Sequence, residues 1–409
     1  MSSIRAAALA LAVLSVLGCD RSSNTGRLMP TGPQKDAVTV EASAASLWVS
    51  QIVDTTGPGA TYAMFVPNNW DQSGRRLMVF VHGLVFPGSE VTLPILDRLR
   101  DALGARGFAV AYSSFSENGW AVKDGANRTH QLRGLFAARF GEPAQTFIYG
   151  RSLGGLIGVM LAEKYSDQYA GVFAECGAVS GASIALRYLF DVRRLFDYFY
   201  PGLLPGNALG VPEEWHPGPD DANRVQAAMV ADMSGALAIA KIDQTPLQFA
   251  SPAELRAAII DVLTVHSFEV NDVMQRAHGR PPVTSSTFTA TDATGSPRLD
   301  PALLESINAN TLHFEAASDA ANFAAHSYDP TGDLRIPVMT LTTSRDPRLP
   351  PALNELVYQS RVDAAGRSDM YLRRQLSRYG HCNFTADERL NGFLDFVSWA
   401  ESRGSAISP

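Results

Sequence analysis

The chain contains a short motif whose residue types and spacing suit nucleophilic chemistry. Gly150-Arg151-Ser152-Leu153-Gly154 has the pattern G-x-S-x-G and lies between the strand-like run TFIYG (146–150) and a helix-like segment that begins at Leu153. A sharp turn between strand and helix exposes the serine hydroxyl, and the flanking glycines, Gly150 and Gly154, leave room for close backbone approach. The five letters alone are a weak signal, and a glycine-rich turn with an incidental serine is the alternative. Their position between strand and helix predicts that Ser152 is a nucleophile.

A nucleophilic serine needs a histidine to take its proton and a carboxylate to orient that histidine. Asp346 follows the buried-strand pattern PVMTLTT (337–343), and His381 follows the strand-like MYLRRQL (370–376). Both therefore come at the end of a strand, where catalytic loops lie. The competing aspartates either precede the first of these strands or follow the helix between them: Asp329, Asp333, Asp363 and Asp369. Six other histidines fall in helices or in the insertion described below: His130, His216, His266, His278, His313 and His326.

The order serine, aspartate, histidine along the chain resembles the α/β-hydrolase superfamily, in its serine esterase and lipase type. The resemblance covers roughly residues 60–175 and 335–400. It implies a carboxylic ester hydrolase that acts on hydrophobic acyl or aryl esters, small or polymeric, through an acyl-enzyme on Ser152. A serine peptidase or polyester depolymerase of the same fold is the alternative reading, and a surface-binding lipoprotein is the non-enzymatic one.

The segment His82-Gly83-Leu84 closes the strand LMVFVH (77–82) and resembles the oxyanion loop of that superfamily. The resemblance implies that the backbone N–H groups of Leu84 and Leu153 stabilise the oxyanion of the tetrahedral intermediate. Only one glycine accompanies the histidine, so the HGGG form of the loop is absent. We expect His82 to be structural rather than a proton carrier.

Alternating strand and helix patterns predict an α/β fold, with a mostly parallel central sheet flanked by helices. The alternation stops after Cys176 for about 160 residues, in which helical patterns dominate at 181–200, 222–242, 252–277 and 301–325. We expect one sheet interrupted by a large helical cap insertion. The predicted divisions are a hydrolase core at 37–180 and 331–409 and a cap at 181–330. Helical leucine spacing also occurs over 89–106, and the aromatic stretch 185–206 could line an acyl pocket or pack within the cap.

The amino terminus has the pattern of an export signal. Arg5 precedes an apolar stretch, residues 6–17, that is too short to span a bilayer. The stretch ends in Val16-Leu17-Gly18-Cys19, which resembles a bacterial lipobox, so residues 1–18 are a predicted signal peptide and Cys19 a predicted lipidation site. Residues 19–36 would be a flexible tether. We expect the protein in the cell envelope, anchored by lipid on the periplasmic or extracellular side; an ordinary cleaved signal, which leaves a secreted protein, is the alternative.

Composition and the cysteines narrow the remaining choices. The chain has 409 residues, 46% hydrophobic and 18% charged, with a net charge of −7 and no basic run, so nucleic acid is not an expected partner. No metal-ligand or dinucleotide motif is found, and we expect neither a metal nor a cofactor. Apart from Cys19, the cysteines are Cys176 and Cys382, which follow strands at the same predicted sheet edge. We predict a disulfide between them, with two buried thiols as the alternative.

Overall fold

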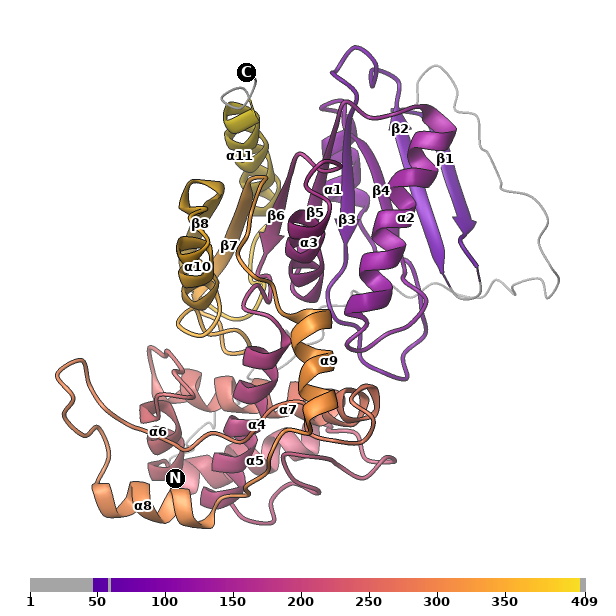
Figure 1. Ribbon diagram of the computed structural model, residues 1–409. Helices are drawn as coiled ribbons and strands as arrows, with labels where there is room; N and C mark the ends of the chain where they lie inside the picture. The colour runs from indigo at the N-terminus through magenta and orange to yellow at the C-terminus, as the bar shows by residue number, and fades with distance from the viewer. Residues whose placement is uncertain (1–46, 58–59, 405–409) are drawn as a thin grey trace, which may run out of the picture. The chain divides into compact units, whose positions relative to one another are not determined.

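The computed structural model describes residues 47–57 and 60–404, and its centre is an eight-stranded sheet (Figure 1). The strand order is β1-β2-β4-β3-β5-β6-β7-β8. Only β2 runs opposite to the others, since it pairs antiparallel with both β1 and β4. The strands are β1 (Trp48–Thr55), β2 (Thr61–Pro67), β3 (Arg76–Val81), β4 (Ala109–Ser113), β5 (Gln145–Arg151), β6 (Gly171–Glu175), β7 (Val338–Arg345) and β8 (Tyr371–Tyr379).

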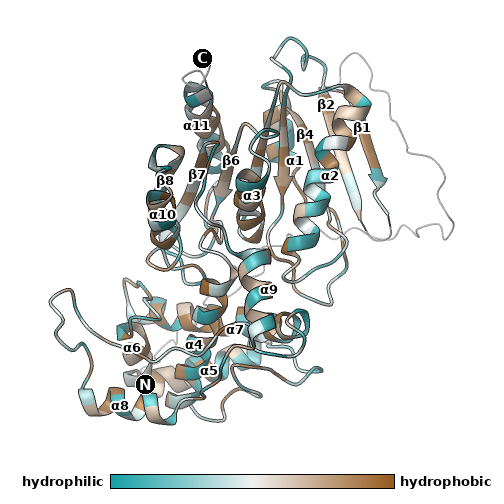
Figure 2. Cartoon of the chain, in the orientation of Figure 1, coloured by the Kyte–Doolittle hydropathy of each residue, from teal (hydrophilic) through white to brown (hydrophobic). Residues whose placement is uncertain are grey.

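The central strands are apolar on both faces because helices cover both sides of the sheet. Every residue of β4 and β6 is buried, which explains why these strands read as continuous apolar runs rather than alternating ones. On one face lie α2 (Val122–Phe140), α3 (Leu153–Lys164) and α10 (Glu355–Ala364); on the other lie α1 (Asp97–Gly104) and α11 (Ala386–Gly404). Figure 2 shows the apolar colouring concentrated in the strands. The predicted α/β class with a mostly parallel sheet is confirmed.

The chain between β6 and β7 forms six helices that add no strand to the sheet. They are α4 (Ala182–Phe199), α5 (Pro219–Ala231), α6 (Ser234–Lys241), α7 (Pro252–Arg276), α8 (Pro301–Asn310) and α9 (Ser318–Tyr328). We call these helices and their connections the cap. The predicted aromatic stretch packs largely within it: Phe190 contacts the rings of His266 and Phe314, and Phe196 contacts Tyr200.

Three predicted helices were wrong in extent. The pattern at 222–242 forms two helices, α5 and α6, because the Asp232 carboxylate accepts a hydrogen bond from the Ser234 N–H in a local turn. The pattern at 301–325 also forms two, since backbone N–H groups after α8 donate to Thr284 and Ser285 side chains instead of continuing a helix. Over 89–106 only α1 is helical, and Pro94 lies in the part that is not.

The carboxyl-terminal helix α11 begins with a capping box. The Thr385 side chain accepts from the Glu388 N–H, and the Glu388 carboxylate accepts from the Thr385 N–H.

The amino-terminal predictions, including the signal peptide at 1–18, Cys19 and the tether, lie outside the described residues. Among the described residues, no helix combines the length and apolar character needed to cross a bilayer.

Candidate active site

Ser152 occupies a strained turn between β5 and α3. Its φ of 54° lies in the left-handed region, which side chains other than glycine rarely adopt. The glycines around it are required by space, since a Cβ on Gly150 would clash with the Gly154 carbonyl and one on Gly154 with the Val81 carbonyl. The turn therefore lifts the Ser152 hydroxyl out of the sheet edge, as the G-x-S-x-G pattern predicts.

The structure brings the three predicted catalytic side chains into one hydrogen-bonded row. The distance from Ser152 Oγ to His381 Nε2 is 2.8 Å, and the distance from His381 Nδ1 to Asp346 Oδ2 is also 2.8 Å. The Asp346 side chain is 2% exposed and that of His381 10%, while Ser152 is half-buried. With Nδ1 donating to Asp346, Nε2 is left to accept the serine proton.

The loop after β7 holds the Asp346 carboxylate in place. Asp346 Oδ1 accepts from the N–H groups of Arg348, at 2.9 Å, and Leu349, at 3.1 Å. The carbonyl of Pro347 accepts from the Tyr188 hydroxyl of α4 at 2.6 Å. One carboxylate oxygen is thus fixed by backbone and the other faces the histidine, which leaves the acid little freedom to rotate.

The histidine loop is fixed through Gly380. This residue has a φ of 104°, its N–H donates to the Arg345 carbonyl, and its own carbonyl accepts from the Thr343 hydroxyl at 2.7 Å. Because both partners belong to β7, the strand that carries Asp346, the same element positions the histidine and its acid. The positive φ explains why a glycine precedes His381.

The predicted oxyanion donors flank Ser152. Leu153 is the first residue of α3, and Gly83 lies so close that its Cβ would be 3.1 Å from Ser152 Cβ, which places Leu84 beside the nucleophile. Within the described part of the chain, neither the Leu84 nor the Leu153 N–H has a protein acceptor. Free N–H groups at a helix start favour negative charge.

His82 is a buried structural residue, as expected. Its ring stacks on Phe115 with centroids 3.8 Å apart, and its Nδ1 lies 2.7 Å from the Gly83 carbonyl oxygen. Burial lowers the pKa of His82, so the ring is neutral at neutral pH.

Cys176 and Cys382 meet next to the catalytic histidine. Their Cα atoms are 5.3 Å apart, a separation that suits a disulfide, and both have positive φ. With His381 these sulfurs form the single group of possible metal ligands among the described residues. The group therefore consists of the histidine of the row and the neighbouring cysteine pair.

Two buried acids near the triad were not foreseen from the sequence. Glu175 immediately precedes Cys176 and is 1% exposed. Its carboxylate accepts from the Tyr149 hydroxyl and lies 3.0 Å from Arg389 Nε. Glu355 begins α10; burial, with the charge of Asp346 nearby, raises its pKa to about 7. A hydrophilic residue at a helix start normally reads as an exposed cap, so no local signal identified Glu355.

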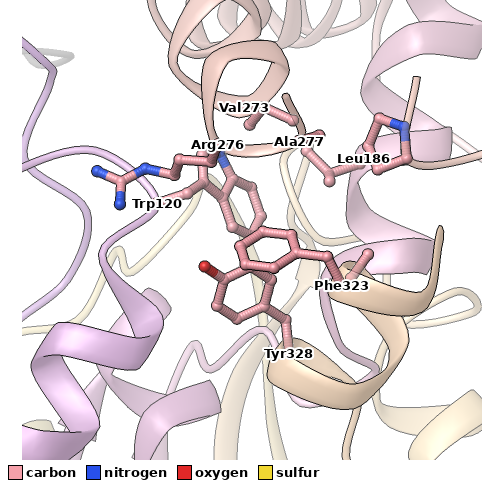
Figure 3. Close-up of a pocket in the computed structure, with 9 residues that line it drawn as sticks. Trp120, Leu186, Val273, Arg276, Ala277, Phe323 and Tyr328 are labelled. Atoms are coloured by element: carbon pink, nitrogen blue, oxygen red, sulfur yellow. The ribbon is translucent and has the colours of Figure 1, made fainter. Parts of the chain in front are cut away.

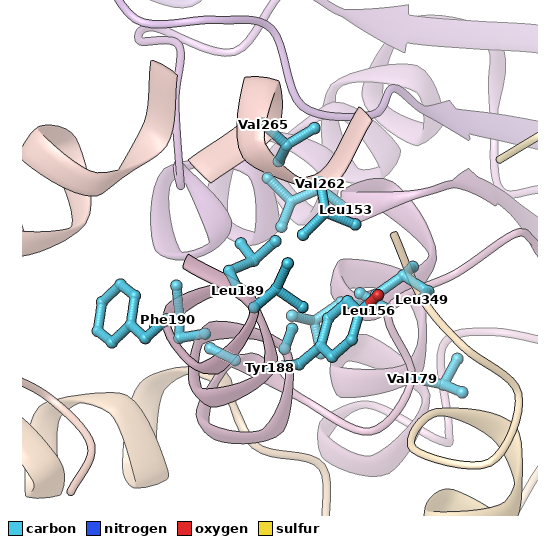
Figure 4. Packing of buried hydrophobic residues seen from close by; sticks show 14 of the residues in the cluster. Leu153, Leu156, Val179, Tyr188, Leu189, Phe190, Val262, Val265 and Leu349 are labelled. Carbon is cyan, nitrogen blue, oxygen red and sulfur yellow. The ribbon is translucent and has the colours of Figure 1, made fainter. Parts of the chain in front are cut away.

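The cap helix α7 crosses the carboxyl edge of the sheet above the site. Near β7, Asp261 forms a two-bonded ion pair with Arg348, at 2.9 and 2.7 Å. Further along, Val262 and Val265 share a hydrophobic cluster with Leu153, and Figure 4 shows these side chains gathered where α7, α4 and the start of α3 meet.

The second half of α7 continues over the loops that follow β3 and β4. Phe268 stacks on Phe86, with ring centroids 4.2 Å apart, and Asp272 accepts from the Trp120 N–H at 2.8 Å. One helix thus touches the acid loop, the elbow, the oxyanion loop and the loop after β4. Through these contacts α7 covers the site.

The sheet order and the elbow decide the fold. Six parallel strands share one carboxyl edge, the serine turn lies after β5, and the loops after β7 and β8 supply the acid and the histidine. The chain has the α/β-hydrolase fold.

Comparison with known proteins gives only distant likenesses to this chain. No family profile and no curated protein matches its sequence. Among solved structures, it is similar to feruloyl esterase B from Aspergillus oryzae, with 18% identity, a TM-score of 0.44, and 88% of this chain and 81% of the esterase covered. It is also similar to tannin acyl hydrolase from Aspergillus niger, with 13% identity and a TM-score of 0.43. That match covers 90% of this chain and 82% of the tannin acyl hydrolase.

The Pyrococcus horikoshii acylaminoacyl peptidase is a third such structure, with 9% identity and a TM-score of 0.43. The match covers 89% of this chain, which spans only 41% of the length of the peptidase. The fold assignment rests on the sheet order and the elbow.

Proposed function

We propose that this protein is a serine hydrolase that cleaves carboxylic esters through an acyl-enzyme on Ser152. The row of hydrogen bonds from Ser152 Oγ to His381 and on to Asp346, 2.8 Å at each step, carries the proposal. A serine hydroxyl is a weak nucleophile until a base takes its proton, and this row provides the base and the group that orients it. A protein that only binds a ligand has no need of such a row.

The acylation step follows from this geometry. As Ser152 Oγ attacks the ester carbonyl carbon, His381 Nε2 takes the hydroxyl proton and Asp346 stabilises the resulting imidazolium. The carbonyl oxygen becomes an oxyanion, which accepts hydrogen bonds from the N–H groups of Leu84 and Leu153 in this proposal. The intermediate collapses, the C–O bond to the alcohol breaks, and His381 gives its proton to the departing alkoxide.

Deacylation repeats the sequence with water. His381 takes a proton from a water molecule while the water oxygen attacks the acyl carbon. The bond between the acyl carbon and Ser152 Oγ then breaks, and the serine recovers its proton from His381. The products are a carboxylic acid and an alcohol, and the enzyme returns to its starting state. No cofactor or metal is required for either half of the cycle.

The surroundings of the elbow favour an apolar substrate. Leu153, Leu189, Val262 and Val265 belong to one buried cluster beside Ser152. Apolar lining with a few placed polar groups is typical of sites that bind small hydrophobic molecules. We therefore assign hydrophobic acyl or aryl esters as the substrate class.

Turnover of graded substrates tests the proposal. The purified protein is incubated with p-nitrophenyl esters of increasing acyl length and with a series of peptide p-nitroanilides. Ser152→Ala is measured in parallel, with Ser360→Ala as the control, because the Ser360 hydroxyl donates to the Leu356 carbonyl within α10. We expect ester turnover that Ser152→Ala abolishes and Ser360→Ala keeps. Turnover of anilides in preference to esters would make the protein a peptidase; no turnover of either series would reject the hydrolase.

We further propose that the chain is exported and lipidated at Cys19, which rests on the lipobox-like sequence. Expression in a bacterium fed an alkyne fatty acid, followed by fractionation, tests this. The wild type should carry the label and sediment with membranes, whereas Cys19→Ser should do neither. An unlabelled wild type in the soluble fraction would show an ordinary secreted protein.

A further inference from the structure

A small pocket lies where the cap meets the loop after β4. It lies between α4, α7, α9 and the loop after β4, and Figure 3 shows the indole of Trp120 together with the rings of Phe323 and Tyr328 in its wall. Leu186 of α4 and Val273 of α7 also line the pocket. Apart from Arg276, the lining is aromatic and aliphatic, which suits an apolar group.

Two rows of residues connect this pocket with the nucleophile. On α4, Leu186 lines the pocket and Leu189, one turn further, is in the cluster around Leu153. On α7, Val273 lines the pocket and Val265, two turns back, is in that same cluster. Positions 265, 269 and 273 repeat every four residues on one helix face, so Glu269 lies on α7 between Val265 of the cluster and Val273 of the pocket wall.

Glu269 is a buried acid that lacks a hydrogen-bond partner. The residue is 1% exposed, and neither of its carboxyl oxygens has a partner among the described residues. Burial, together with the charge of Asp272, raises the pKa of Glu269 well above its usual range, which favours the protonated form of the carboxyl. A protonated carboxyl offers one O–H donor and one carbonyl acceptor.

The cations closest to Glu269 are already engaged by other groups. Arg348 makes both of its side-chain bonds to Asp261. Arg276 bonds to Asp272, to the Glu117 carboxylate and to the Asn118 carbonyl. The carboxyl therefore has no ion-pair role, and a buried polar group without a partner is costly to the folded state.

A second unsatisfied polar atom belongs to a residue of the pocket wall. Trp120 lines the pocket, is 6% exposed, and its Nε1–H has no acceptor among the described residues. Its backbone N–H is taken by Asp272, which lies one turn beyond Phe268 on α7. An orphaned donor thus lines the pocket and an orphaned donor–acceptor group lies on the adjoining helix, and such groups suit a site that orients a polar group on an apolar ligand.

We propose that Glu269 is a specificity-determining residue that hydrogen-bonds a hydroxyl group of an otherwise apolar ester, with the Trp120 Nε1–H as a second donor. A hydroxyl both donates and accepts, so it satisfies both oxygens of a neutral carboxyl. The inference rests on the proposed ester hydrolase and names its substrate class, an ester that carries a hydroxyl on its apolar portion. A site built to bond a hydroxyl rejects the analogue that lacks it.

Binding to an enzyme that cannot turn over separates this inference from the proposed function. In the Ser152→Ala background, Kd is measured for two pairs of esters: methyl 3-phenylpropanoate with its 4-hydroxyphenyl analogue, and 2-phenylethyl acetate with its 4-hydroxyphenyl analogue. We expect the hydroxyl compound of at least one pair to bind about tenfold more tightly or better. Adding Glu269→Leu should remove that difference while binding of the plain ester is kept.

A matched control and a stability readout exclude a structural role. Ser267→Ala removes another buried hydroxyl of α7, one that donates to the Leu263 carbonyl of the same helix, and should keep the preference. Glu269→Leu should also raise Tm, since it removes an unpartnered buried carboxyl. Equal binding within both pairs, or a preference that survives Glu269→Leu, would overturn the inference. Turnover of plain esters by the parent enzyme would leave the ester hydrolase standing in that case.

Discussion

Removal of the pair Cys176 and Cys382 should weaken both the fold and the site. If the two are joined, they close a loop with a sequence separation of 206 residues. In the chain-entropy model, a crosslink over such a loop removes about 18 cal/mol/K from the unfolded ensemble, or about 5 kcal/mol at 25 °C. We expect the free energy of unfolding of the double variant Cys176→Ser/Cys382→Ser to be lower than that of the wild type by most of this amount.

The catalytic consequence follows from the position of the pair. Cys382 adjoins His381 in sequence, and Cys176 follows β6 in the middle of the sheet, so the link ties the histidine loop to a rigid strand. Without it, the histidine loop keeps the Gly380 contacts and the Arg389 hydrogen bond to the Cys382 carbonyl but loses its covalent link to the sheet. A displacement of about 1 Å costs roughly a hundredfold in rate, so we expect kcat to fall at least tenfold.

Urea denaturation followed by circular dichroism measures the first effect, and hydrolysis of a p-nitrophenyl ester measures the second. The wild type treated with dithiothreitol should match the double variant, and the variant itself should not respond to the reductant. A loss below about 1 kcal/mol with full activity would refute the reasoning. So would alkylation of both cysteines in unreduced, unfolded wild-type protein, because it would show free thiols.

Three further predictions concern the elbow, a buried acid and the cap. Gly154→Ala should lower kcat/KM at least about a hundredfold, because its Cβ would clash with the Val81 carbonyl and displace the elbow; ester kinetics with circular dichroism as a folding check measure this. The pKa of Glu355 is about 7 in the folded state, against 4.5 for an unperturbed glutamate, so between these pH values the folded state retains a proton that the unfolded state loses. The free energy of unfolding should therefore fall by about 3 kcal/mol as pH rises through that interval. Urea titrations at pH 5 and pH 8 should show a correspondingly smaller loss for Glu355→Gln. Asp261→Asn leaves Arg348 without its carboxylate and should lower kcat with less effect on KM, whereas an unchanged kcat would mean that the cap does not hold the acid loop.

Much of the site could be predicted because its signals are local in sequence. A serine between glycines at a strand-to-helix junction specifies a turn by itself, and parallel strands place their following loops at one edge. Ser152, Asp346 and His381 could therefore be selected without knowledge of their distances. The structure adds the groups that hold them, such as the Gly380 backbone with its positive φ.

The position of α7 over the site could not be predicted, because the contacts of this helix join residues far apart in sequence. The helix pattern at 252–277 indicated α7 but not which side faces Ser152. Glu269 and Glu355 read as ordinary charged helix residues, and only tertiary packing buries them. The break between α5 and α6 was missed for a local reason, since Asp232 can continue a helix or close a turn and the pattern gave no preference.

The central claim is that Ser152 carries the acyl group during catalysis. Rapid acid quench of the enzyme mixed with a p-nitrophenyl ester, followed by intact mass measurement and peptide mapping, tests it directly. We predict a single added acyl group, mapped to the peptide that contains Ser152 and absent from Ser152→Ala. An acyl group found on another residue, or full turnover by Ser152→Ala, would contradict the account.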